Sequence, residues 1–135
     1  MVRLLIFLAA VVGVVAAQAS ELDATRLAGA LRVREGYRGV DGRLGELGPW
    51  QLREITWRQH MAGKPFAMAR QEGPARLCAE RHIEWLRREL RRIGLPDSVF
   101  NVAAAWNAGL DRYTTGRAPE RAYLYARDVE RLYLQ

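Results

Sequence analysis

Apolar residues recur at helical spacing in the part of the chain that follows residue 20. Four of them succeed one another at intervals of three and four positions: Ala24, Leu27, Ala28 and Leu31. This pattern is typical of an amphipathic helix with one buried face, and it predicts a helix over residues 23–35 with Asp23 as its N-cap. Glu35 takes the next position on the apolar stripe, one turn after Leu31, and a glycine-rich segment follows it.

The same spacing, together with glycine and proline boundary signals, predicts further helices. They cover residues 50–60, a short helical turn at 66–70, residues 74–93, residues 98–108, and a last helix after Pro119. Gly94 suits a left-handed helix cap. No alternation typical of strands persists, and only residues 37–47 leave room for a small hairpin. The sequence therefore predicts an all-α domain, or an α domain with a minimal hairpin.

The first residues have the features of a signal peptide. Arg3 precedes an apolar run over residues 4–15, and residues 17–19 (Ala-Gln-Ala) fit the small-x-small cleavage rule. The run is short for a bilayer span of about 20 residues. We therefore expect a signal peptide over residues 1–19 and one domain over residues 20–135, exported to the periplasm or secreted. An uncleaved N-terminal anchor, with transient membrane association, is the alternative.

The chain is basic, with a formal net charge of +6. Most of the charge lies in one segment, as Arg76, Arg81, Arg87, Arg88, Arg91 and Arg92. Apolar residues occupy the opposite face of the same predicted helix, so we expect the arginines on a solvated face. A basic exported protein is attracted to anionic polymers. Nucleic acid is the weak option, because the aromatic residues that stack single-stranded bases are absent from this segment.

The single cysteine and the two histidines offer little chemistry. Cys78 has no second cysteine to pair with, so we expect it to be a small buried residue. His60 and His82 lack metal-ligand spacing with it and are interpreted as surface or packing residues. These residues therefore give no indication of a metal site.

Three polar residues stand where apolar ones are expected. Glu35 ends the first predicted helix on its apolar face, where partial burial raises the pKa of a carboxyl group toward the range of a general acid. Gln51 opens the second predicted helix, and Asn107 follows a face of small apolar residues. A buried amide without a partner costs about 1–3 kcal/mol, so each requires a protein or ligand partner. Together they indicate a polar cleft; singly, Glu35 can fray into solvent, and the two amides can be helix caps.

Four segments, in order, resemble the lytic transglycosylase (SLT) domain of the lysozyme-like superfamily. Residues 45–51 read Gly-Glu-Leu-Gly-Pro-Trp-Gln and are similar to the family's Gly-Ala-x-Gly-Leu-Met-Gln. Glu35 occupies the place of its catalytic glutamate. Residues 104–109 read Ala-Ala-Trp-Asn-Ala-Gly and resemble Ala-x-Tyr-Asn-Ala-Gly, and residues 125–129 resemble its closing Tyr-x-x-x-Val helix.

The resemblance implies a lysozyme-like helical fold that cleaves peptidoglycan glycan strands at the β-1,4 bond between N-acetylmuramic acid and N-acetylglucosamine. Glu35 is then the catalytic residue, and Tyr125 orients it. Gln51 and Asn107 hold the saccharide, and Trp50 and Trp106 offer aromatic faces for sugars. The mechanism uses one carboxyl group and no cofactor.

This chain departs from the family pattern at several positions. Gly36 replaces the serine that usually follows the glutamate, and the segment between Glu35 and Gln51 is slightly shorter, which puts the extent of the glycan groove in question. Glu46, and after it Asp41, are the nearby acids that can act as a second carboxylate. Three alternatives to the transglycosylase stay open: a muramidase that releases reducing ends, a non-catalytic glycan-binding module, and a helical protein acting through its arginine face.

Overall fold

The computed structural model describes residues 21–135, and this part of the chain is all-α, as predicted. Its elements in chain order are α1 (Ala24–Glu35), α2 (Glu54–His60), the 3-10 helix η1 (Phe66–Arg70), α3 (Glu72–Arg92), α4 (Val99–Ala108), α5 (Leu110–Thr114) and α6 (Glu120–Leu134). The only pairing of extended backbone within residues 21–135 is an isolated bridge between Leu47 and Leu52. The predicted signal peptide, residues 1–19, lies outside the described residues.

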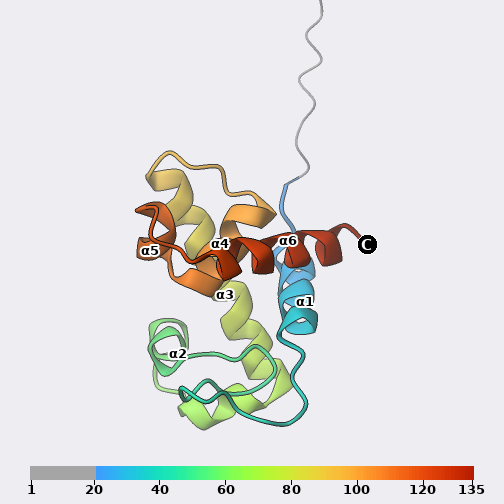
Figure 1. The fold of residues 1–135 in the computed structure, drawn as a ribbon. Helices are drawn as coiled ribbons and strands as arrows, with labels where there is room; N and C mark the ends of the chain where they lie inside the picture. The colour runs from blue at the N-terminus through green and yellow to red at the C-terminus, as the bar shows by residue number, and fades with distance from the viewer. Residues whose placement is uncertain (1–20) are drawn as a thin grey trace, which may run out of the picture.

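The long helix α3 passes between two groups of elements (Figure 1). On one side α2 and η1 pack against α3 and against each other, and we call residues 36–71 the loop lobe. On the other side α4 packs against α6 and α5, while α1 packs against α6; these four helices form the helical lobe. The N–H of Asp23 donates to the Tyr133 hydroxyl at 3.0 Å, so the start of the described chain lies beside the end of α6.

Local sequence signals fix most helix ends where they were predicted. The Asp23 carboxylate accepts from the N–H of Arg26 at 3.1 Å and caps α1. After α3, Gly94 adopts a left-handed conformation with φ of 83°. The N–H of Leu95 then donates to the Leu90 carbonyl and that of Gly94 to the Arg91 carbonyl, the two bonds of a Schellman motif.

Two details of the predicted helices are wrong. Residues 50–53 form a turn rather than the first turn of a helix, so α2 begins at Glu54. The short helix α5 was not predicted: its five residues present no apolar stripe, and none of them is buried. The optional hairpin within residues 37–47 is absent from the described structure, because Leu47 pairs with Leu52 beyond that range.

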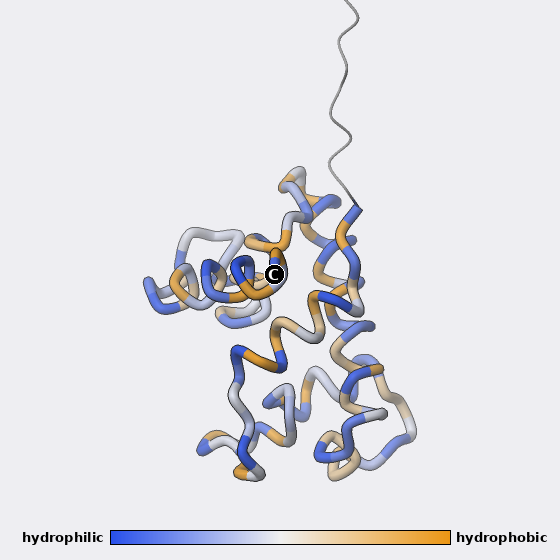
Figure 2. The backbone as a smooth tube through the Cα atoms, turned by 90° about the vertical axis from the view of Figure 1, so that its right-hand side faces the viewer, coloured by the Kyte–Doolittle hydropathy of each residue, from blue (hydrophilic) through white to orange (hydrophobic). Residues whose placement is uncertain are grey.

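The core is built from the predicted apolar faces, and α3 is shared by both lobes. Hydrophobic and hydrophilic positions follow one another along the helices (Figure 2), and the buried core is drawn from the hydrophobic ones. Cys78 is buried, as predicted, and burial raises the pKa of its thiol to about 12. Ile93, expected on the apolar face of α3, is 41% exposed, because it lies past the last turn that packs against the core.

The arginine face of α3 is more structured than a solvated face. Arg87 is only 6% exposed, contrary to the prediction. Its guanidinium donates to the carboxylates of Asp97 and Glu84, each at 3.0 Å, which satisfies a charge that would otherwise be costly to bury. Arg91 also contacts Asp97, at 2.6 Å. Much of the positive charge of this helix is therefore neutralised within the described chain.

Candidate active site

Glu35 is the last residue of α1, and its carboxyl group faces the junction of the two lobes. The hydroxyl of Tyr125, on α6, donates to the Glu35 carboxylate at 2.7 Å. A second link between the same two helices lies beside it, because Arg34 donates to Asp128 at 2.9 Å and stacks over the Tyr125 ring at 5.1 Å. The acid is therefore held in place by the packing of α1 against α6.

The surroundings of Glu35 favour its protonated form. Burial raises the pKa of Glu35 above its ordinary value, and the nearby charge of Glu46 acts in the same direction. Hydrogen bonding from Tyr125 and Trp106, and the charge of Arg34, oppose this shift without cancelling it. A carboxyl group in such a setting can carry a proton at a pH at which a solvated one has lost it, which a general acid requires.

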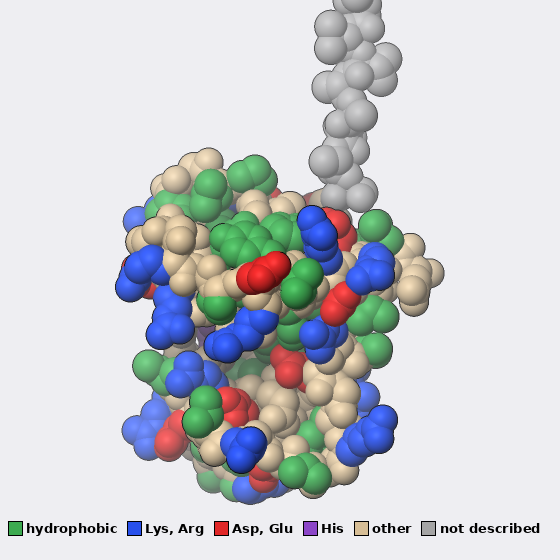
Figure 3. Space-filling model, viewed as in Figure 1, with side chains coloured by type: hydrophobic (Ala, Val, Ile, Leu, Met, Phe, Trp, Pro, Cys, Tyr) green, Lys and Arg blue, Asp and Glu red, His purple; other side chains and the backbone are tan. Residues whose placement is uncertain are grey.

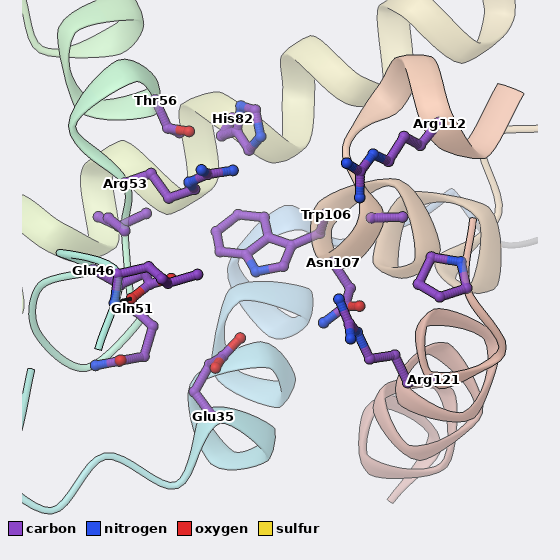
Figure 4. A pocket seen from close by; sticks show the side chains of 14 residues that line it. Glu35, Glu46, Gln51, Arg53, Thr56, His82, Trp106, Asn107, Arg112 and Arg121 are labelled. Atoms are coloured by element: carbon purple, nitrogen blue, oxygen red, sulfur yellow. Dashed lines mark hydrogen bonds between the residues drawn. The ribbon is translucent and has the colours of Figure 1, made fainter. Parts of the chain in front are cut away.

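Glu35 lines a cleft of about 620 Å³ between the two lobes. In the space-filling view, basic side chains gather along the hollowed middle of this face (Figure 3). The cleft is lined by Glu35, Leu44, Glu46, Gln51, Leu52, Arg53, Thr56, His82, Trp106, Asn107, Ala108, Arg112, Pro119 and Arg121. Glu35, Gln51, Trp106 and Asn107 thus come together from three separate parts of the chain (Figure 4).

Gln51 reaches the cleft from a tight turn, not from the predicted helix. The N–H of Gln51 donates to the Gly48 carbonyl at 2.9 Å, and its side-chain amide donates to the same oxygen at 2.8 Å. With φ of 48°, Gln51 is the only residue other than glycine with a positive φ in residues 21–135. Such a conformation costs roughly 1–3 kcal/mol, and residues held in it cluster at functional sites.

Two glycines of the loop lobe, Gly48 in this turn and Gly42 before it, allow a close approach of neighbouring groups. At Gly48, with φ of 72°, a Cβ atom would lie 1.9 Å from the Ala69 carbonyl oxygen. At Gly42, a Cβ would lie 2.1 Å from a carboxylate oxygen of Glu46. Within the loop lobe, the backbone at Gly48 therefore packs directly against η1, and the backbone at Gly42 packs against the Glu46 side chain, which lines the cleft.

Trp50 does not line the cleft, and the expectation that it offers a face to sugars is wrong. Its side chain is fully buried, and its indole N–H donates to the Ala28 carbonyl at 2.8 Å. The guanidinium groups of Arg32 and Arg76 cover the ring at 5.8 and 5.2 Å. Trp50 instead anchors the turn that carries Gln51 to α1, the helix that carries Glu35.

Asn107 and Trp106 lie on the opposite side of the cleft, at the end of α4. Asn107 is exposed, and within the described residues its side chain has no hydrogen-bond partner that would make it a helix cap. The cap of α4 is formed by the N–H of Gly109, which donates to the Ala105 carbonyl at 2.9 Å. Trp106 is half-buried and keeps part of its ring toward the cleft.

Two nearby carboxylates have different surroundings. Glu46 lines the cleft and accepts from the N–H of Leu44 at 3.1 Å. Asp41 accepts from Arg70 at 2.9 Å and from the N–H of Gly48 at 3.1 Å, and the hydrogen bond from Arg70 is the main reason why the pKa of Asp41 is lowered. Asp41 therefore fastens the loop lobe, whereas Glu46 is placed to meet a ligand.

Sequence reasoning missed several cleft residues. His82, interpreted as a surface or packing residue, does pack: it stacks on Trp85 and contacts His60 at 2.9 Å between ring nitrogens. It also lines the cleft, which was not predicted. Burial and the His60 ring lower the pKa of His82 to about 3, so it is neutral at physiological pH. Arg53, Arg112 and Arg121 also line the cleft. None of these positions follows a motif or an apolar stripe, so nothing in the sequence could have singled them out.

The described residues hold no cluster of three or more histidine, cysteine or acidic side chains able to bind a metal ion. Within the same range, no helix is long and apolar enough to cross a membrane. No family model, curated protein or solved structure matches the chain.

Proposed function

We propose that this protein is a lysozyme-like lytic transglycosylase that cleaves peptidoglycan glycan strands between N-acetylmuramic acid and N-acetylglucosamine. The observation that supports this most strongly is the Glu35 carboxyl group, raised in pKa by burial and bonded to Tyr125 at the wall of a polar cleft. Export, expected from the first 19 residues, would bring the protein to this polymer.

In the proposed reaction, protonated Glu35 donates its proton to the glycosidic oxygen as the bond to the muramoyl C1 breaks. The developing oxocarbenium-like centre is stabilised by the substrate's own 2-acetamido group, one of the known exceptions to the two-carboxylate scheme. Glu35, now a carboxylate, takes the proton of the muramoyl 6-hydroxyl as that oxygen bonds to C1. The products are a 1,6-anhydro end and a released N-acetylglucosamine 4-hydroxyl.

The other cleft residues would bind and orient the strand. Gln51 and Asn107 approach from opposite lobes with amide groups suited to hydroxyl and acetamido partners. Trp106 is the aromatic surface in the cleft on which a sugar ring can stack. Tyr125 lies behind Glu35 rather than in the cleft lining, so its role is to position the carboxyl group.

A muramidase is the second candidate, and Glu46 is the observation that favours it. Its carboxylate lines the same cleft as Glu35 and is near enough to raise the pKa of Glu35. If Glu46 activates water or supports the cationic centre, the same site yields reducing ends by hydrolysis.

The test is digestion of purified peptidoglycan followed by mass analysis of the fragments. Anhydro ends support the transglycosylase and reducing ends the muramidase, while a Glu35→Gln variant serves as the inactive control. Binding of glycan without any product would mark a non-catalytic module and overturn the proposal. Binding of membranes or nucleic acid instead would point to the arginine face of α3, much of whose charge is already paired.

A further inference from the structure

Three arginines line the cleft around Trp106, and the proposed reaction does not use them. Arg53 immediately precedes α2, Arg112 lies on α5 and Arg121 lies on α6. All three belong to the cleft lining, and their guanidinium groups point toward the space around the indole ring (Figure 4). They come from both lobes, so a ligand that meets all three must lie across the junction.

These arginines have no ion-pair partner within residues 21–135, in contrast to Arg87, Arg91 and Arg92 of α3. Each of the three is exposed. The remaining charged groups of the lining are Glu35 and Glu46, while His82 is neutral. When Glu35 carries the proton it would donate, the lining therefore holds three cations and one anion. A site of this kind attracts negative charge.

We infer that the cleft recognises carboxylates carried by the glycan, so that its preferred substrate is an anionic strand rather than a neutral one. This inference rests on the proposed function. Arginine suits the role because its planar guanidinium can bind a carboxylate through two parallel hydrogen bonds. Muramic acid supplies such groups beside the scissile bond, either as the free lactyl carboxylate of a strand without peptides or as the carboxylates of an attached stem peptide.

The arrangement also orients a bound sugar. Trp106 lies among the three arginines, so a sugar ring stacked on it places its substituents toward the guanidinium groups. A neutral N-acetylglucosamine polymer offers the same ring and acetamido contacts and lacks the charge. The cleft would then discriminate between the two polymers by electrostatics. The difference between their binding affinities would decrease as salt screens the exposed charges.

The experiment measures binding in the Glu35→Gln background, in which bound glycan is not consumed. The ligands are chitohexaose, strands freed of peptide, the same strands with their carboxylates converted to amides, and strands with intact peptides. We expect the carboxylated strands to bind about tenfold more tightly than the amidated strands or chitohexaose at low salt. Tighter binding of peptide-free strands assigns the lactyl carboxylate, and tighter binding of intact strands assigns the stem peptide.

Arginine variants test whether these three residues supply the preference. Arg112→Ala and Arg121→Ala should each reduce the preference about three- to tenfold, with an unchanged melting temperature because both side chains are exposed. Arg127→Ala is the matched control, since Arg127 is an exposed residue of the same helix as Arg121 and does not line the cleft. Arg127→Ala should bind all four ligands as the parent does.

Equal affinity for carboxylated and amidated strands would overturn the inference, as would an unchanged preference in both cleft variants. Failure of the proposed function is distinguishable. If the wild-type protein releases no products, but the Glu35→Gln protein still prefers carboxylated strands through Arg112 and Arg121, the carboxylate-binding inference holds and the proposed enzymatic function is wrong. If the wild type cleaves amidated and carboxylated strands equally well, the enzyme stands and the inference fails.

Discussion

The Glu35 carboxyl group is subject to opposing influences. Burial at the lobe junction favours the neutral acid, whereas the hydroxyl of Tyr125 and the indole of Trp106 stabilise the carboxylate. Opposing influences of this kind suit a group that must give up a proton in one step and take one back in the next. The pKa of Glu35 stays above its ordinary value, so its burial dominates.

Replacing Glu35 by glutamine separates catalysis from stability. The glutamine keeps an oxygen for the Tyr125 hydroxyl but cannot transfer a proton, so we expect turnover to fall at least about a hundredfold. Because folding raises the pKa of Glu35, its contribution to stability is present at acid pH and is lost as pH rises through the folded-state pKa. The variant should match the wild-type melting temperature at pH 4 and equal or exceed it at pH 8. Thermal melts at both pH values and a peptidoglycan assay check this, and near wild-type cleavage would end the assignment of Glu35.

Tyr125→Phe removes one hydroxyl and keeps the ring that packs in the core. We expect turnover to fall about tenfold, equivalent to about 1.4 kcal/mol of transition-state stabilisation, with a largely unchanged melting temperature. The lost hydrogen bond normally lowers the pKa of Glu35, so the basic limb of the activity–pH profile should move to higher pH. Full activity with an unshifted profile would mean that Tyr125 only packs, and lower stability with full turnover would mark a structural bond.

At the residue scale, the sequence indicated the acid and its partner but not what surrounds them. Glu35 and Tyr125 occupy the apolar stripes of α1 and α6. Periodicity alone left Glu35 free to fray into solvent, and only the family resemblance paired it with Tyr125; the structure joins the two side chains at 2.7 Å. Trp50 was misplaced because an aromatic residue near a motif can face either a ligand or the core. Only tertiary packing, here against Ala28 and two arginines, decides between these.

At the scale of elements, the loop lobe holds Gln51 in place through specific contacts, although residues 36–53 contain no helix. Within this lobe, Arg70 donates to Asp41, the backbone of Leu47 pairs with that of Leu52, and Gly48 packs against η1. Helical periodicity carried no information about residues 36–53 of this lobe, because their hydrogen bonds are those of local turns and side-chain contacts. Apart from α5, the helices were predictable to within a few residues, since each buries apolar residues at helical spacing and begins or ends at a capping, glycine or proline signal.

Two substitutions at Gln51 can separate the contribution of its side chain to binding from the effect of its strained backbone on stability. Gln51→Gly removes the amide and relieves a φ of 48°, so stability should hold or rise while glycan binding weakens. Gln51→Ala removes the same amide but keeps the strained φ, so it should bind as weakly and be no more stable than the wild type. Isothermal titration and chemical denaturation of both variants provide the measurement.

Asn107→Ala is the companion variant on the opposite lobe. Because Asn107 is exposed and does not cap α4, we expect weaker binding with no loss of stability. Wild-type affinity in all three variants would remove both amides from the proposed site.

For the whole molecule, the important feature is that the site lies between two lobes that share α3. Glu35 and Trp106 belong to the helical lobe, whereas Gln51 and Glu46 belong to the loop lobe. A ligand that contacts both lobes gains its full binding energy only while both lobes stay packed against the buried face of α3, which fixes their relative position. We therefore expect glycan binding to stabilise the entire domain rather than one part of it.

Cys78 provides a direct measurement of this coupling. It is the only cysteine of the chain, it is fully buried on α3, and burial raises the pKa of its thiol to about 12. At pH 8 a thiol reagent should therefore react only when the core opens, and the labelling rate should follow the population of unfolded protein in a denaturant series. Saturating peptide-free glycan, added to the Glu35→Gln protein, should slow labelling by the factor that mass action predicts from its dissociation constant. Rapid labelling without denaturant would show that α3 opens locally, and in that case the two lobes could not act as one binding unit.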